Sequence, residues 1–129
     1  MQQRNVLGDE LIPCSMDPLT GYYRSGCCEN RGDDPGLHVV CCQVTDEFLE
    51  FSKDHGNDLS TPMPQYRFPG LNPGDRWCVT APNWARAYNE GVAAPVVLAA
   101  TNEAVLAVVP FAALKQHAVD VPDDVSSLE

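Results

Sequence analysis

The stretch HVVCCQV, from His38 to Val44, is the part of this sequence that decides its fold. It is short, mostly apolar and rich in β-branched valine, which is typical of a buried strand. A second strand-like run, RWCVT, extends from Arg76 to Thr80. We expect these two runs to be strands of a small, mainly antiparallel sheet.

A helix is expected directly after each of these strands. Thr45 can cap the first helix, two carboxylates follow in its first turn, and Gly56 ends it. Pro82 suits the first turn of the second helix, which runs through Glu90. The sequence therefore alternates strand, helix, strand and helix through its middle.

The alanine-rich region that follows can be interpreted in two ways. Residues 95–100 and 104–109 resemble two strands around a turn at 101–103, whereas the many alanines favour a single helix. Pro110 then opens a final helix that runs to about His117. We expect one domain over residues 5–118 and a polar C-terminal tail over 119–129.

Two long segments carry few signals of regular structure. Residues 8–37 are rich in turn dipeptides, and residues 57–75 contain four prolines. Loops of this length inside a compact domain are often functional. The predicted fold is α+β: a small, mainly antiparallel sheet, two or three helices, and two long ordered loops packed together on one side.

Composition excludes several classes of protein. The 129 residues include 8 basic and 18 acidic side chains, which gives a net charge of −10. A nucleic-acid binder needs clustered positive charge, so we expect no nucleic-acid partner. The acidic residues are scattered, which favours a solvated surface suited to high salt over an acidic face for a cationic partner.

The compartment is predicted from the apolar segments. The first ten residues contain no apolar run typical of a secretory signal. The most apolar stretch, 92–114, is interrupted by Glu103, which is costly in a bilayer. We therefore expect a cytoplasmic protein with no membrane partner and with reduced thiols.

No standard catalytic motif is present, so the candidate chemistry rests on the cysteines and histidines. One hypothesis is a metal site, with zinc the ion considered, although no cofactor is the default expectation. Four ligands suit tetrahedral zinc, but on a regular strand His38 and Cys41 would point to opposite faces. The ligand set of this hypothesis is Cys14, Cys28, His38 and Cys41.

A second hypothesis is a reactive thiolate. Arg24 and Arg31 flank Cys28 in the sequence, and nearby cations lower the pKa of a thiol. His38 could then serve as its base. The alternative is that each cysteine is a small buried apolar residue, which is what a free cysteine usually is.

Several motifs resemble one known family. They include GYYR at Gly21–Arg24, GLH at Gly36–His38, GNDLSTP at Gly56–Pro62 and GDRWC at Gly74–Cys78. Over about residues 5–118 the chain resembles the uncharacterised, mostly bacterial family called domain of unknown function 2237. This resemblance implies a small single-domain protein with no assigned activity. It also implies that Cys14, Cys28, Cys41, Cys78 and His38 are typical family residues, whereas family members often have a cysteine where this chain has Thr80.

We place the candidate site where the two long loops meet, because functional residues concentrate on loops held by a scaffold. The function expected from sequence is the binding of a small ligand or a protein partner in this cleft. Whether the protein is an enzyme stays open, and a thiol-dependent enzyme or a zinc protein is the alternative. The candidate binding residues are Cys14, Arg24, Cys28, His38, Asp58, Asp75 and Arg76.

Overall fold

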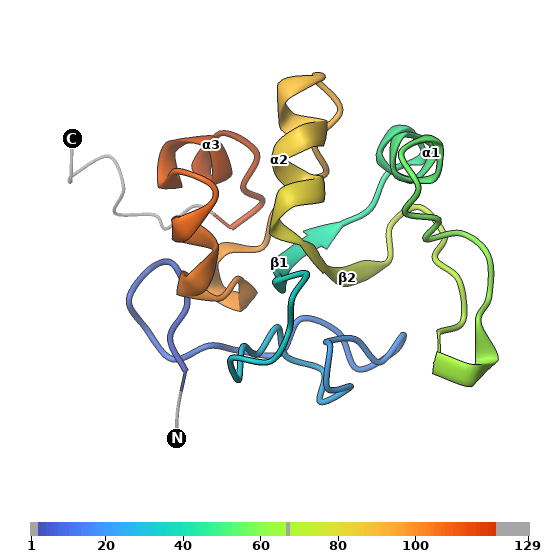
Figure 1. Cartoon of the computed structure of the whole chain (residues 1–129). Coiled ribbons are helices and arrows are strands. Elements are labelled where there is room, and N and C mark those ends of the chain that lie inside the picture. The colour runs from blue at the N-terminus through green and yellow to red at the C-terminus, as the bar shows by residue number, and fades with distance from the viewer. Residues whose placement is uncertain (1–2, 67, 121–129) are drawn as a thin grey trace.

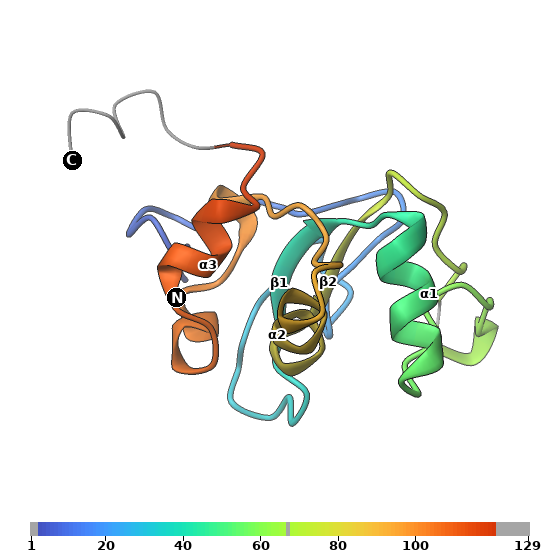
Figure 2. The ribbon, with the colours of Figure 1, turned by 90° about the horizontal axis from the view of Figure 1, so that it is seen from above.

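The computed structural model describes residues 3–66 and 68–120, and within them a two-stranded antiparallel sheet lies between helices and a long loop. This confirms the predicted α+β class. Figures 1 and 2 show the helices on one side of the sheet and the N-terminal segment on the other. The strands are β1 (His38–Gln43) and β2 (Arg76–Thr80), and the α-helices are α1 (Asp46–Asp54), α2 (Ala81–Asn89) and α3 (Phe111–Gln116).

The three α-helices begin where the sequence predicted. The Thr45 hydroxyl accepts a hydrogen bond from the N–H of Phe48 at 3.1 Å, which satisfies an N–H that the first turn of α1 leaves free. Pro82 lies in the first turn of α2, and Pro110 directly precedes α3. The polar tail expected over 119–129 lies almost entirely outside the described residues.

Both sequence interpretations of residues 95–109 are wrong. The segment forms neither a hairpin nor one helix but two 3₁₀ turns, η2 (Leu98–Ala100) and η3 (Glu103–Ala107). Its first residues bond to the free edge of β1, since Val97 N–H donates to the Cys41 carbonyl at 2.8 Å. The Asn102 side chain then accepts from the N–H of Ala104 and starts η3, so the chain turns before a second strand can form.

The strand register decides what each face of the sheet carries. Cys41 lies opposite Cys78, so both side chains point to the same face. A β-bulge between His38 and Val40 shifts the pairing, and His38 lies opposite Thr80, two residues beyond Cys78. The regular strand assumed from sequence is therefore interrupted, and the bulge places His38 on the face that carries Cys41.

The larger hydrophobic core lies between the sheet and the helices. It includes Phe48 of α1, Trp84 of α2 and Leu114 of α3, all fully buried. The Trp84 indole N–H donates to the Ala94 carbonyl at 3.0 Å, which satisfies the one polar atom of that side chain. None of the helices in the described parts of the chain is long and apolar enough to cross a membrane.

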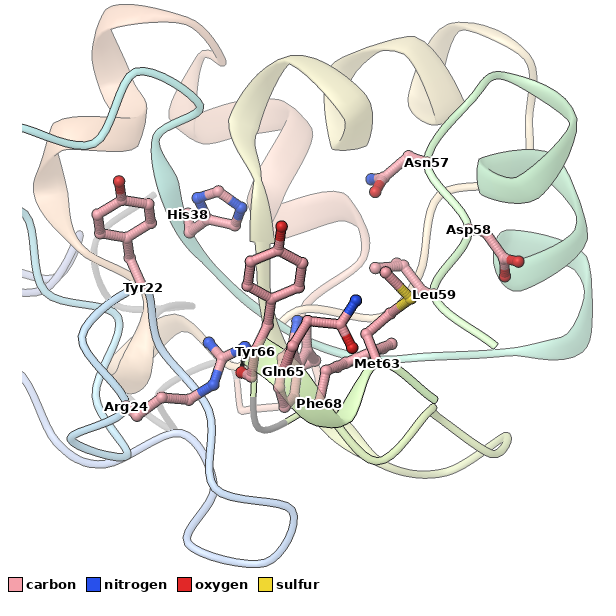
Figure 3. Close-up of a pocket in the computed structure, with 11 residues that line it drawn as sticks. Tyr22, Arg24, His38, Asn57, Asp58, Leu59, Met63, Gln65, Tyr66 and Phe68 are labelled. Carbon is pink, nitrogen blue, oxygen red and sulfur yellow. Dashed lines mark hydrogen bonds between the residues drawn. The ribbon is translucent and has the colours of Figure 1, made fainter. Parts of the chain in front are cut away.

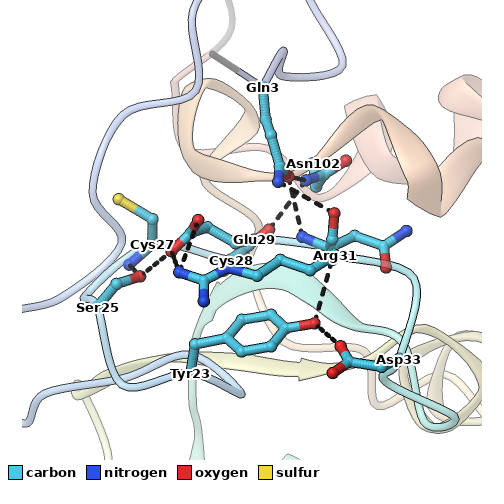
Figure 4. Close-up of polar contacts among 10 residues, drawn as sticks. Gln3, Tyr23, Ser25, Cys27, Cys28, Glu29, Arg31, Asp33 and Asn102 are labelled. Carbon is cyan, nitrogen blue, oxygen red and sulfur yellow. Dashed lines mark hydrogen bonds and ion pairs between the residues drawn. The ribbon is translucent and has the colours of Figure 1, made fainter. Parts of the chain in front are cut away.

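The N-terminal segment is held by side chains rather than by regular structure. Buried Asn102 donates to the Cys28 carbonyl at 3.1 Å and to Gln3, and Gln3 in turn bonds the backbone of Asn30. Figure 4 shows these bonds above a second set, in which the Tyr23 hydroxyl joins Arg31 and Asp33. The loop expected from sequence is thus ordered.

Four cysteines cross-link this segment to the sheet. Cys14 is bonded to Cys41 of β1, and Cys28 to Cys78 of β2. The expectation of reduced thiols therefore does not hold for these four residues in this structure. Cys27 and Cys42 are free, with Cys27 partly exposed and Cys42 buried.

Counting reactive thiols tests this pairing. In the native oxidised protein we expect Ellman's reagent to modify Cys27 alone, and to modify Cys42 as well once the chain is unfolded. Burial raises the pKa of the Cys42 thiol, which slows its reaction further. The Cys27→Ser variant should show no accessible thiol when folded. More than two reactive thiols in the unfolded, unreduced chain would contradict the two disulfides.

Candidate functional site

A pocket lies between the two long loops, the region in which the sequence analysis placed the candidate cleft. It has a volume of about 710 Å³ and opens beside the start of β1 and β2 (Figure 3). Among the described residues, three of the nine exposed large apolar side chains line it, namely Tyr22, Met63 and Tyr66. Exposed apolar groups gathered at one hollow are typical of a binding site.

One wall comes from the N-terminal segment and is built around Arg24. Its backbone has a φ of +56°, a conformation uncommon for residues other than glycine. The guanidinium lies 5.0 Å from the centre of the Trp77 ring, and Nη2 donates to the Tyr66 carbonyl at 3.1 Å. Arg24 therefore links the two loops on this side of the pocket.

His38 is held beside this wall by a buried carboxylate. Its Nδ1 lies 2.9 and 3.0 Å from the two carboxylate oxygens of Asp34, whose side chain is fully buried. The same carboxylate accepts from the N–H groups of Gly36 and His38 at 3.0 and 2.7 Å. A Cβ at Gly36 would lie 3.0 Å from Cε1 of His38, so glycine leaves room for the ring.

The contact with Asp34 determines which nitrogen of the His38 ring is available to a ligand. A carboxylate accepts only, so Nδ1 carries the proton between His38 and Asp34, and Nε2 is the ring nitrogen left for a ligand. Tyr22 packs against the imidazole, with the ring centres 5.5 Å apart. Leu37, next to His38, also has a positive φ, of +54°. Strained backbone concentrates at functional sites, and here both strained residues adjoin one pocket.

The opposite wall is formed by side chains from residues 57–66 and by Phe68, and it includes the 3₁₀ turn η1 (Pro64–Tyr66). Asp58 lies on this side, away from Tyr22 and His38 (Figure 3). Its carboxylate accepts from the Thr61 hydroxyl at 2.7 Å and from the N–H of Ser60 at 2.9 Å. These bonds hold the pKa of Asp58 below its ordinary value, the Thr61 hydroxyl contributing most.

Three of the seven residues proposed from sequence line this pocket: Arg24, His38 and Asp58. Cys14 and Cys28 are instead buried in disulfides beneath the sheet. Asp75 and Arg76 lie outside the residues that form the pocket wall. Asp75 accepts from the N–H of Asn72 at 2.9 Å, so its carboxylate closes the turn before β2.

The structure separates His38 from the cysteines of the two thiol hypotheses. Of the metal set, Cys14, Cys28 and Cys41 lie in one buried cluster, in which Cys14 is bonded to Cys41 and Cys28 to Cys78, whereas His38 faces Asp34. Cys28, the thiolate candidate, is not a free thiol. Burial, and secondarily the charge of Glu29, raises the pKa of Cys27 instead of lowering it. His38 therefore has no thiolate partner among the described residues.

Sequence reasoning missed Asp34, although a signal for it exists. Asp34 opens the turn Asp34-Pro35-Gly36, in which an aspartate bonds the N–H two residues ahead, and His38 follows four residues later. Tyr66 and Met63 were also missed, because nothing in a proline-rich loop indicates which side chains point inward. Trp77 lines the pocket as well as packing in the core.

Substitution of Asp34 tests the support of His38. In Asp34→Asn an amide NH₂ replaces an oxygen that accepts an N–H, so a buried donor loses its partner. We expect unfolding free energy in urea to fall by about 1–3 kcal/mol. The exposed neighbour variant Asp33→Asn should change it by less than about 0.5 kcal/mol. Equal losses in the two variants would show that the Asp34 carboxylate has no special role.

The lowered pKa of Asp58 predicts how the stability of the protein depends on pH. A carboxyl whose pKa is lower in the folded state than in the unfolded state stabilises the fold above its unfolded pKa, and this stabilisation disappears as the pH falls through the folded pKa. We expect the free energy of unfolding to decrease less steeply below about pH 4 in Asp58→Asn than in the unchanged protein. Chemical unfolding across an acid pH series measures this, and parallel curves would contradict it.

Comparison with known proteins identifies the family of this chain. No curated protein matches the chain significantly. The family model described as "Uncharacterized protein conserved in bacteria (DUF2237)" matches residues 4–118, which is most of the chain. The resemblance noted in the sequence is thereby confirmed: the chain belongs to the DUF2237 family.

Proposed function

We propose that this protein binds a small organic ligand in the pocket between the two loops. The main support for the proposal is that exposed tyrosine rings and a histidine held in a fixed orientation line the same pocket. Tyr66 is 66% exposed and Tyr22 43% exposed, although both line the pocket. His38 packs against Tyr22 and has a buried carboxylate behind it. A side-chain set of this kind supports recognition rather than packing.

The lining suggests the chemistry of the ligand. Aromatic and thioether walls favour a flat, ring-containing group, because rings pack on rings over a large area. Arg24 and His38 lie on one side, where the Arg24 guanidinium offers positive charge and hydrogen-bond donors. The carboxylate of Asp58 is on the other side and is already engaged with its own loop. The proposed ligand is therefore a ring with a carboxylate or a similar acceptor at one end.

The rigidity of the pocket supports binding without large rearrangement. The Cys28–Cys78 disulfide joins the segment after Arg24 to the residue after Trp77. The Thr20 hydroxyl accepts from the buried N–H of Cys78 at 2.8 Å and holds the segment just before Tyr22. A wall fixed at both ends loses little conformational freedom when a ligand binds.

The proposal also includes the compartment. The compartment proposed is the cytoplasm, although disulfides are rare there and common in oxidising compartments. A cytoplasmic location therefore requires that the four paired cysteines have a second, reduced form that still holds the loop to the sheet. The scattered acidic residues support a solvated surface in that setting.

Binding of simple ring compounds tests the proposal. We expect phenylacetate to shift the backbone amide resonances of residues 20–24, 36–38 and 57–66 in two-dimensional NMR. Phenethylamine, which has the same ring and the opposite charge, should bind more weakly. In Tyr66→Ala the dissociation constant for phenylacetate should rise about two- to tenfold, because one ring contact is lost.

The matched control is Leu106→Ala, which removes an exposed apolar side chain outside the pocket. Because Arg24 bonds the backbone carbonyl of Tyr66, the Tyr66→Ala change leaves that bond in place. Equal effects of the two variants, or no saturable shift with either compound up to about 10 mM, would contradict a ligand pocket of this chemistry.

A further inference from the structure

Four cysteines from separate parts of the chain meet in a single buried cluster beneath the sheet. Cys14 and Cys28 come from the N-terminal segment, Cys41 from β1 and Cys78 from β2. All four are at most 4% exposed, and the cluster also contains Val97 and Ala100. The sulfurs of Cys14, Cys28 and Cys78 lie within 4.8 Å of one another, and that of Cys41 is bonded to Cys14.

From this arrangement we propose that the reduced protein binds one zinc ion through Cys14, Cys28, Cys41 and Cys78. Zinc prefers four thiolates at about 2.3 Å in a tetrahedron, which places ligand sulfurs roughly 3.8 Å apart. The Cys14 sulfur already lies within 4.8 Å of both sulfurs of the Cys28–Cys78 disulfide, whereas the Cys41 sulfur is not within this distance of all three. The sulfurs within each pair must move apart, and the Cys41 side chain must turn toward the second pair, which rotation about its side-chain bonds supplies.

The ligand set differs from the one expected from sequence in a single residue. Cys78 replaces His38, because the register of the sheet places Cys78 directly opposite Cys41. His38 is engaged with Asp34 and lines the pocket instead. Thr80 lies two residues beyond Cys78, so its identity leaves this set of four complete.

A bound metal ion would also stabilise the reduced protein. Reduction without metal would leave four thiols in an apolar cluster and would release the N-terminal segment from both strands. That segment contains little regular secondary structure, so the cross-links restrict much of its conformational freedom. One zinc ion bonded to all four sulfurs would tie the same segment to the same two strands.

Reduction of the two disulfides precedes metal binding at this cluster. A dithiol reductant transfers two electrons and two protons to each disulfide, which opens to two thiols, while the reductant closes to its own disulfide. Zinc then displaces one proton from each of the four thiols, and four protons pass to solvent. In the reverse direction a disulfide oxidant accepts two electrons for each protein disulfide that forms again, takes up two protons to become two thiols, and the zinc ion is released. Metal binding and disulfide pairing therefore exclude each other at this cluster.

Cobalt titration of the full-length, reduced protein tests the proposal. The two disulfides are opened with a phosphine without oxygen, and the phosphine is removed. Addition of Co²⁺ should give the strong visible absorption of tetrahedral cobalt thiolate, saturating at one equivalent, and Zn²⁺ should abolish it. The protein with both disulfides intact should give no such absorption.

Matched variants distinguish the ligand sets. The absorption should be lost or altered in Cys78→Ser and retained in Cys27→Ser, which changes a cysteine outside the cluster. It should also be retained in His38→Gln. Retention in Cys78→Ser, or loss in His38→Gln, would overturn the proposed ligands. Absence of the tetrahedral spectrum in the unchanged reduced protein would overturn the site itself.

A second measurement needs no variant and therefore does not depend on the folding of Cys78→Ser. The reduced protein is treated with iodoacetamide with and without Zn²⁺, and modified peptides are identified by mass spectrometry. Zinc should protect Cys14, Cys28, Cys41 and Cys78 together and leave the reactivity of Cys27 unchanged. Protection of none of the four, or of Cys27 equally, would refute the proposal.

Discussion

Cys41 and Cys78 lie opposite each other on the two strands, and each is bonded to a cysteine of the N-terminal segment. A two-stranded sheet is marginal by itself, and a segment of nearly forty residues with little regular structure is costly to order. Cross-links spanning 27 and 50 residues each contribute about 3–4 kcal/mol in the chain-entropy model. The order of one whole side of the molecule depends on these two bonds.

The pocket is a consequence of the same constraint. Its N-terminal wall carries Tyr22 and Arg24, which lie between the two half-cystines Cys14 and Cys28. Its opposite wall belongs to the loop that connects α1 to β2. The sheet therefore positions both sides of the pocket. His38 stands at the bulge where β1 begins, and buried Asp34 fixes its ring. The site and the sulfur cluster are thus neighbours that share the same loop and the same strands.

Local signals in the sequence were sufficient for the regular elements but not for residues 95–109. Thr45 and Pro82 mark the starts of α1 and α2. Their effects, a side-chain hydrogen bond and a restricted backbone angle, act within one helical turn and do not depend on distant parts of the chain. Val97, by contrast, bonds to Cys41, far away in the chain, and Thr101 accepts from the same residue. The conformation of residues 95–109 is therefore determined by hydrogen bonds to residues that are distant in the sequence.

By itself, the sequence determined the class of the fold, the two strands and the three helix starts, because these follow from patterns within a few residues. The meeting of the two long loops joins distant segments, so it belongs to the tertiary structure. Tertiary structure alone decided the pairing of Cys41 with Cys14 and of Cys78 with Cys28, the bond from His38 to Asp34, and the removal of both sulfur pairs from the pocket. Which cysteines meet depends on strand register, and the side to which His38 points depends on one bulge. A shift of one residue reverses the face of every side chain, and local sequence patterns do not specify that shift.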